Sequence, residues 1–291
     1  MTSTAPRRAD VVLAFATLLW GLSFIVVKGA LASSTPLAFT AVRFTLAAIA
    51  LTPFTNLRPP YPRSELRAGA LLGGLLAIGF ATQTVGLVYT TPARSAFIVA
   101  SSSVLAPVVA FIAVRERPRL WVVAALGLAA AGMYLLTAPD AGGLNRGDAW
   151  TLVTALSFGG QIVAVAHLSR RYDPLRLVWM ETVVTAVGAA LAAAMVEHVH
   201  VGCSPALAGA LVYTAILATA VALLWQMRAQ RAMSAARAAL IFCLEPVFAA
   251  LASWVWFGER LSALQWVGGG LILAGMVLAE LPGGPAGAEP V

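Results

Sequence analysis

The chain alternates between long apolar runs and short polar connections over its whole length. Most runs are about 20 residues long, which is the length that an α-helix needs to cross about 30 Å of hydrocarbon. Backbone groups in lipid must be hydrogen-bonded within their own segment, so the runs are predicted to be helices and not isolated strands. Ten runs occur, at residues 11–31, 36–53, 68–89, 93–114, 121–136, 149–167, 175–195, 204–227, 235–257 and 262–281. We therefore predict an all-α integral membrane protein with ten transmembrane helices.

Residues 93–135 are repeated without a gap at residues 236–278, an offset of 143. The charged matches carry the most weight because only 11% of the chain is charged, and they pair Arg94 with Arg237, Glu116 with Glu259, and Arg117 with Arg260. Each half holds five spans, and an odd number makes the second half enter the membrane from the opposite side. We expect two inverted five-helix repeats at 1–140 and 141–291, the second ending in a short disordered tail.

The basic residues predict the orientation of the chain. With the amino terminus inside, fourteen of the nineteen lysines and arginines fall in cytoplasmic segments. Positive residues concentrate in the cytoplasmic loops of membrane proteins. We therefore expect the protein to lie in the cytoplasmic (inner) membrane with both termini in the cytoplasm. The net charge of +7 is thus explained by topology, and no nucleic-acid partner is expected. A hydrophobic content of 60% agrees with the lipid bilayer as the solvent.

Glu245 is the most unusual residue within a predicted span. It lies near mid-membrane, and Pro246 follows it and is expected to kink the helix. A carboxylate at that depth must be protonated, paired or in contact with a wet cavity. We therefore name Glu245 as a candidate substrate ligand or proton site. The alternative is a protonated side chain that only fixes helix packing.

Arg43 and Glu181 occupy corresponding places in the second helix of each half, at an offset of 138. Because the halves are inverted, the two side chains are expected in opposite leaflets and not paired with each other. Both are candidates for a proton or gating role. Arg43 could hold an outer gate or a substrate carboxylate, but the more common role of an arginine near the end of a span is a structural lock on loop carbonyls.

Uncharged polar and aromatic residues supply further candidates for a substrate cavity. Amides and hydroxyls offer donors and acceptors at a lower burial cost than charges, although they also join membrane helices to one another. The candidates are Trp20, Phe24, Gln83, Ser101, Ser102 and Gln161. Gln226 matches Gln83 at the offset of 143. The fifth and tenth helices instead carry small residues such as Gly132 and Gly275, which predict close helix contact.

Several function classes lack their sequence signals. There is no Gly-x-x-x-x-Gly-Lys-Ser/Thr loop, so ATP hydrolysis by this chain is not expected. No nucleophile elbow or His-Glu-x-x-His motif is present, and no enzyme activity is predicted. His198 and His200 alone are weak evidence for metal, so neither a metal nor another cofactor is expected.

Motifs at 19–24 (LWGLSF), 41–44 (AVRF), 115–118 (RERP), 244–250 (LEPVFAA) and 258–261 (GERL) resemble those of the EamA-type permeases in the drug/metabolite transporter superfamily. The resemblance covers essentially the whole chain. It implies ten helices in two inverted repeats and a central cavity lined by helices 1, 3, 4, 6, 8 and 9. It weakens a direct substrate role for Arg43 and Glu181. Phe158-Gly159 stands where a tryptophan is common, so a one-sided aromatic wall is expected.

The sequence therefore predicts a secondary transporter that moves a small polar or amphipathic metabolite across the cytoplasmic membrane by alternating access, as an exporter. An amino acid, a nucleoside and a drug-like solute all stay open as cargo. The expected partners are this solute, the lipid bilayer and protons, and the chain is a monomer or a homodimer. An intramembrane enzyme acting on lipid-linked substrates and a passive channel remain the alternatives.

Overall fold

The computed structural model describes residues 4–57, 61–115, 120–137, 145–257 and 262–280. Within these ranges every regular element is a helix. The elements are α1 (Thr4–Ala30), α2 (Pro36–Leu51), η1 (Thr52–Phe54), α3 (Arg63–Tyr89), α4 (Pro92–Val114), α5 (Leu120–Thr137), α6 (Arg146–Leu168), α7 (Pro174–Val196), α8 (Pro205–Val212), η2 (Tyr213–Val221), α9 (Ala222–Gln230), α10 (Ala235–Phe242), α11 (Glu245–Phe257) and α12 (Ala263–Glu280). The segment α8–η2–α9 forms one span and α10–α11 another, so the prediction of an all-α chain with ten helices is confirmed.

The lengths and surfaces of the helices fit a bilayer. In the described ranges, seven helices are long and apolar enough to cross a membrane, and shorter apolar helices cover Ile98–Ala113, Leu120–Gly132 and Trp266–Gly275. Large apolar side chains such as Met195 also lie exposed on the outside of the protein. A soluble monomer rarely exposes so much apolar surface, whereas lipid tails match it. The chain is a membrane protein.

Some residues named in the sequence analysis lie outside the described ranges. They are Glu116, Arg117, Glu259, Arg260 and the predicted tail.

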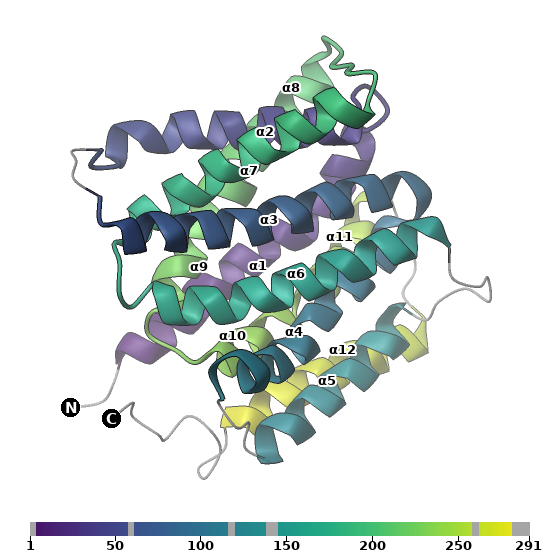
Figure 1. Ribbon diagram of the computed structural model, residues 1–291. Helices are drawn as coiled ribbons and strands as arrows, with labels where there is room; N and C mark the ends of the chain where they lie inside the picture. The colour runs from purple at the N-terminus through teal and green to yellow at the C-terminus, as the bar shows by residue number, and fades with distance from the viewer. Residues whose placement is uncertain (1–3, 58–60, 116–119, 138–144, 258–261, 281–291) are drawn as a thin grey trace.

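The helices form layers that are visible from one side (Figure 1). α2 packs on α7 at one edge of the molecule, and α5 packs on α12 at the opposite edge. Between these pairs, α3 contacts both α7 and α6, and α6 also contacts α4. α1 lies against α9 and α11. The helices between the two edge pairs, α1, α3, α4, α6, α9 and α11, are therefore the ones that can surround a cavity.

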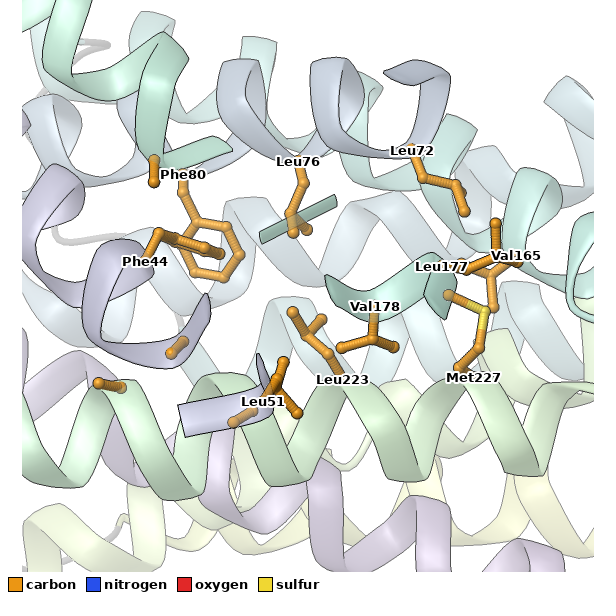
Figure 2. Close-up of a cluster of buried hydrophobic side chains, with 14 of the residues drawn as sticks. Phe44, Leu51, Leu72, Leu76, Phe80, Val165, Leu177, Val178, Leu223 and Met227 are labelled. Carbon is orange, nitrogen blue, oxygen red and sulfur yellow. The ribbon is translucent and has the colours of Figure 1, made fainter. Parts of the chain in front are cut away.

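The largest group of buried apolar side chains joins α2, α3, α6, α7 and α9 (Figure 2). Phe44 and Phe80 meet edge to face with ring centroids 4.9 Å apart. Leu72 and Leu177 are fully buried in the same group. Lipid tails are as apolar as these side chains, so close van der Waals packing, more than exclusion of water, holds the helices together.

The eighth span contains a π-helix, η2. Its wider turn is often found at functional sites. The carbonyl oxygen of Ala218 in η2 accepts hydrogen bonds from Trp20 Nε1 at 2.9 Å and from Arg43 Nη2 at 3.3 Å. Thr219 Oγ1 donates to the carbonyl of Thr214, five residues earlier, at 2.7 Å. This segment therefore connects α1 and α2 through polar contacts inside the membrane.

The ninth span is broken just before Pro246. α10 ends at Phe242 and α11 begins at Glu245. Pro246 thus lies in the first turn of α11, where its missing N–H removes no helical hydrogen bond. The sequence predicted a kink at Pro246, but the structure instead has a break in the helix just before this residue. Because of this break, Glu245 lies at the positive amino-terminal end of a helix.

The connection before α8 is joined to the connection before α2. Thr35 N donates to the carbonyl of His200 at 2.9 Å, and Gly202 N donates to the carbonyl of Ser33 at 2.8 Å. Ser34 and Val201 form an isolated antiparallel bridge. We call residues 33–35 and 200–202 the strap.

Glu197, at the end of α7, caps the start of α2. Its Oε1 accepts from Leu37 N at 2.9 Å and its Oε2 from Ala38 N at 3.2 Å. A carboxylate at a helix amino terminus satisfies free N–H groups and the helix dipole. Glu197→Ala is expected to lower stability by about 1 kcal/mol, a decrease of roughly 2–4 °C in the melting temperature of purified protein. His198→Ala changes the adjacent exposed residue and should leave the melting temperature unchanged; equal decreases for both variants would contradict the capping role.

Candidate functional site

A cavity lies among α1, α3, α4, α6, α9, α10 and α11. Its volume is about 60 Å³, enough for a few water molecules. The polar lining residues are Ser23, Gln83, Ser102, Gln161, Gln226 and Glu245. The apolar ones are Trp20, Leu76, Phe80, Val99, Phe158, Ile162, Leu223 and Phe242. The spans that these elements form are the same six spans that the family resemblance implied.

Glu245 borders the cavity where α11 approaches α1. Its side chain is buried except for the part that faces the cavity, with 8% of the residue exposed. Gly21 permits the approach, since a Cβ atom at Gly21 would lie 2.9 Å from the Glu245 carbonyl oxygen. Trp20 and Phe242 stand beside this contact, with ring centroids 5.7 Å apart. Trp20, Phe242 and Glu245 all contribute to the cavity lining.

Amide groups line another part of the cavity. Gln226 Nε2 donates to Gln161 Oε1 at 3.0 Å, which joins α9 to α6. Gln161 Nε2 is buried without a hydrogen-bond partner among the described residues. A buried donor left without a partner costs free energy, and a small rearrangement of its neighbours would satisfy it.

Five of the residues proposed from the sequence lie together in the lining: Trp20, Gln83, Ser102, Gln161 and Glu245. Two others lie elsewhere. Phe24 is 2% exposed in an apolar cluster with Val27 and Phe39. Ser101 is not in the lining, and its hydroxyl donates to the carbonyl of Ile98 at 2.6 Å. The substrate roles of all seven stay predictions.

Arg43 lies behind the lining. Its Nε donates to Thr219 Oγ1 at 2.8 Å, and its guanidinium carbon is 4.6 Å from the centroid of the Phe80 ring. Together with the bond to Ala218, these contacts link α2 to η2 and α3. The contacts match the structural lock considered from the sequence, although the carbonyl belongs to a helix. A gating role for Arg43 stays a prediction.

Glu181 is also buried outside the lining, with no exposed surface. Its carboxyl group lies next to the side chain of Gln161. Neither of its carboxyl oxygens has a hydrogen-bond partner of good geometry among the described residues. The proton role suggested for Glu181 stays a hypothesis, with Gln161 as the connection to the cavity.

The sequence reasoning missed most of the aromatic lining. Phe80, Phe158 and Phe242 all face the cavity, and the rings of Phe80 and Phe158 are 5.2 Å apart. Phe158, which stands where a tryptophan is common, therefore contributes a ring of its own to the lining, and the one-sided aromatic wall stays a prediction. Phe158 could have been identified from the sequence, because the offset of 138 matches it with Trp20.

Comparisons with known proteins support a transport function. An uncharacterized transporter of Archaeoglobus fulgidus is 34% identical over 274 residues, covering 94% of this chain and 86% of that protein. The uncharacterized inner membrane transporter YedA of Escherichia coli K12 is 29% identical over 278 residues, covering 91% and 88%. A solved crystal structure at 20% identity has a TM-score of 0.77 and covers 94% of this chain and 96% of that one, which supports the fold alone.

The family comparison covers nearly all of the chain. The sequence model of the EamA-like transporter family matches residues 7–138 and again residues 145–281. Both matches include helices that line the cavity. The chain is therefore a member of the EamA-like transporter family.

Proposed function

We propose that this protein is a secondary transporter that exports a small polar or amphipathic solute across the inner membrane by alternating access. The observation that carries the proposal is the cavity, whose polar groups meet inside the membrane among six spans. Its volume of about 60 Å³ is far below the roughly 300–1,000 Å³ of a pocket for a drug-sized ligand. The side chains around it must therefore move to admit such a solute, as alternating access requires.

We further propose that the two halves are inverted repeats, at 1–140 and 141–291. The cavity lining supports this, because all but two of its residues form pairs at the offsets of 138 and 143. The pairs are Trp20 with Phe158, Ser23 with Gln161, Phe80 with Leu223, Gln83 with Gln226, Val99 with Phe242, and Ser102 with Glu245. Corresponding positions of two equivalent halves would face a shared axis in this way.

Contacts at glycines support the same relation. Gly21 packs against Glu245, Phe248 and Ala249, and Gly159 packs against Ser102, Leu105 and Ala106. Gly21 corresponds to Gly159 at the offset of 138, and the three neighbours of Gly21 correspond to those of Gly159 at the offset of 143. In the same way Gly132 faces Gly268, while Gly275 faces Ala125. With an inverted arrangement, the arginine distribution assigns both termini to the cytoplasm.

A counterflow experiment tests the carrier. Purified protein in proteoliposomes preloaded with unlabelled solute should take up labelled solute faster than empty vesicles, with saturation. Candidate solutes are amino acids, nucleosides and amphipathic amines. Uptake that is linear in concentration and indifferent to preloading would favour a channel, and chemical conversion of the solute would favour an enzyme. Comparing the two vesicle orientations tests the export direction, and collapsing a pH gradient tests proton coupling at Glu245 or Glu181.

Alternating access also requires a closure on each side of the cavity. Asp10 and Arg237 are candidates for the inner one, since Arg237 Nε and Nη2 donate to the two Asp10 oxygens at 2.9 and 2.6 Å. They join the beginnings of α1 and α10, ten residues (about 15 Å along a helix) before Trp20. At the offsets of 138 and 143 the pair recurs in the sequence as Asp148 and Arg94.

Asp10→Asn is therefore expected to increase opening toward the cytoplasm. The ion pair is only partly buried, so we expect it to be worth about 1 kcal/mol and the increase to be two- to fivefold. The measurement is the labelling rate of a Ser102→Cys reporter from the cytoplasmic side, with Cys203 and Cys243 replaced. The exchange Asp10→Arg with Arg237→Asp should restore slow labelling. A labelling rate that neither change affects would contradict the closure.

A further inference from the structure

The cavity contains a carboxyl group without a partner. Glu245 accepts no hydrogen bond from any described residue, and no lysine, arginine or histidine is among the described residues that line the cavity. Glu245 is the first residue of α11, where the positive end of the helix dipole lies. An ionised carboxylate at this depth is costly unless an opposite charge reaches it. The lining leaves that charge to be supplied by the solute.

Aromatic rings stand around the same space. Trp20 and Phe242 line the cavity together with Glu245, and Phe158 and Phe80 contribute two more rings, of which Phe80 also contacts Arg43. The face of an aromatic ring attracts a cation, most strongly for tryptophan and when water is excluded. A carboxyl group and aromatic rings around one cavity are the groups that bind a positively charged nitrogen carrying apolar groups.

The buried arginine near the cavity does not take the place of this cation. Arg43 is not in the lining, and its guanidinium group is held by Thr219, by Ala218 and by the rings of Phe44 and Phe80. Within the described ranges it forms no ion pair with Glu245. The carboxylate is therefore left to face the cavity.

We propose that the solute is an organic ammonium ion with a small apolar body. Its nitrogen binds between the Glu245 carboxylate and the rings of Trp20 and Phe242. Polar groups on its other end, where it has them, bind the amides of Gln161 and Gln226. This assignment rests on the proposed transport function, because it concerns the same cavity.

Binding to purified protein in lipid nanodiscs tests the assignment by calorimetry. The cations are tetramethylammonium and benzyltrimethylammonium, whose charge does not depend on pH. The comparison solutes are benzyl alcohol and phenylacetate, which are neutral and anionic. Benzyltrimethylammonium is expected to bind at least tenfold more tightly than each comparison solute, and tetramethylammonium to bind more weakly than benzyltrimethylammonium. A comparison solute that binds equally well or better overturns the assignment.

Glu245→Gln removes the charge and keeps nearly the same shape. It should weaken benzyltrimethylammonium binding by about tenfold to a hundredfold. Glu245→Asp keeps the charge and should retain part of the affinity, which guards against a folding defect in the first variant. Glu65→Gln is the matched control, since Glu65 is a buried carboxyl group 3.6 Å from Arg176 and outside the cavity. Unchanged binding by Glu245→Gln overturns the assignment.

The aromatic part of the site has its own variants. Trp20→Leu should weaken benzyltrimethylammonium binding about three- to thirtyfold. Trp150→Leu, at an exposed tryptophan of α6, should not weaken it. Equal effects of the two substitutions would overturn the role of the Trp20 ring.

Counterflow separates failure of this assignment from failure of the carrier. Saturable exchange of phenylacetate or benzyl alcohol, with no recognition of either cation, overturns the ammonium assignment and supports the carrier. Glu245-dependent cation binding without exchange of any solute contradicts the carrier and supports the cation site.

Discussion

Gly132→Ala is expected to destabilise the protein by about 1–3 kcal/mol, although alanine favours helices more than glycine does. A Cβ atom at Gly132 would lie 2.5 Å from the carbonyl oxygen of Gly268 and 2.9 Å from the backbone nitrogen of Ile272. Both neighbours are backbone atoms of α12, so no side-chain rotation relieves the overlap. The two helices must separate, and close packing along α5 and α12 is lost.

The same helices provide controls for Gly132. Gly275→Ala should behave like Gly132→Ala, because its Cβ would lie 2.8 Å from the Ala125 carbonyl oxygen. A Cβ atom added at Gly127 or Gly270 would meet no described atom within 4 Å. Their alanine variants should be neutral or more stable, by up to about 1 kcal/mol. Thermal unfolding of all four purified variants is the measurement, and equal stability across them would reject the backbone contact.

Gly21→Ala is expected to impair both stability and solute binding. The new Cβ would meet the Glu245 carbonyl oxygen at 2.9 Å, Phe248 Cβ at 3.0 Å and the backbone nitrogen of Ala249 at 3.2 Å. Relief of these contacts moves α1 away from α11 at the point where both line the cavity. We expect a stability loss of about 1–3 kcal/mol and at least tenfold slower exchange, since small displacements of positioned groups are costly.

Gly159→Ala is the matched control for Gly21→Ala, at the corresponding place on α6. Its Cβ would lie 3.3 Å from the Ser102 carbonyl oxygen and 3.4 Å from Leu105 Cβ. These contacts are only slightly tight, so the variant should lose less than about 1 kcal/mol. Melting temperatures and counterflow rates measure both effects. If Gly159→Ala lowers the melting temperature and the counterflow rate as much as Gly21→Ala does, the close contact between Gly21 and Glu245 is not the cause of the loss.

Much of the fold could be predicted because the bilayer imposes strong constraints. A helix that crosses lipid has to be long and apolar, so the ten spans follow from hydropathy alone. The small residues at 132 and 275 predicted close contact, and both meet backbone across the α5–α12 interface. The π-helix η2 was not predicted, because its hydrogen-bond shift depends on tertiary contacts such as those of Ala218 with Trp20 and Arg43.

The cavity was predictable only where a residue was costly to bury. Glu245 and the glutamines stand out in an apolar span, so their presence in the lining was anticipated. Phe24 and Ser101 lie outside this lining, and the sequence could not show this, since one residue along a helix turns the side chain by about 100° and tilt is not encoded in hydropathy. Phe80 and Phe242 could not be separated from lipid-facing or packed phenylalanines, which have the same composition.

The strap is a suitable epitope for an antibody fragment used in electron microscopy. Backbone bonds between Thr35 and His200 and between Ser33 and Gly202 make two distant connections a single surface feature. His200 and Val201 are exposed on it, next to the exposed residues 198 and 199. An antibody fragment raised against this epitope would engage both connections at once, and it would give electron microscopy a rigid marker on a protein that is otherwise almost hidden in its micelle.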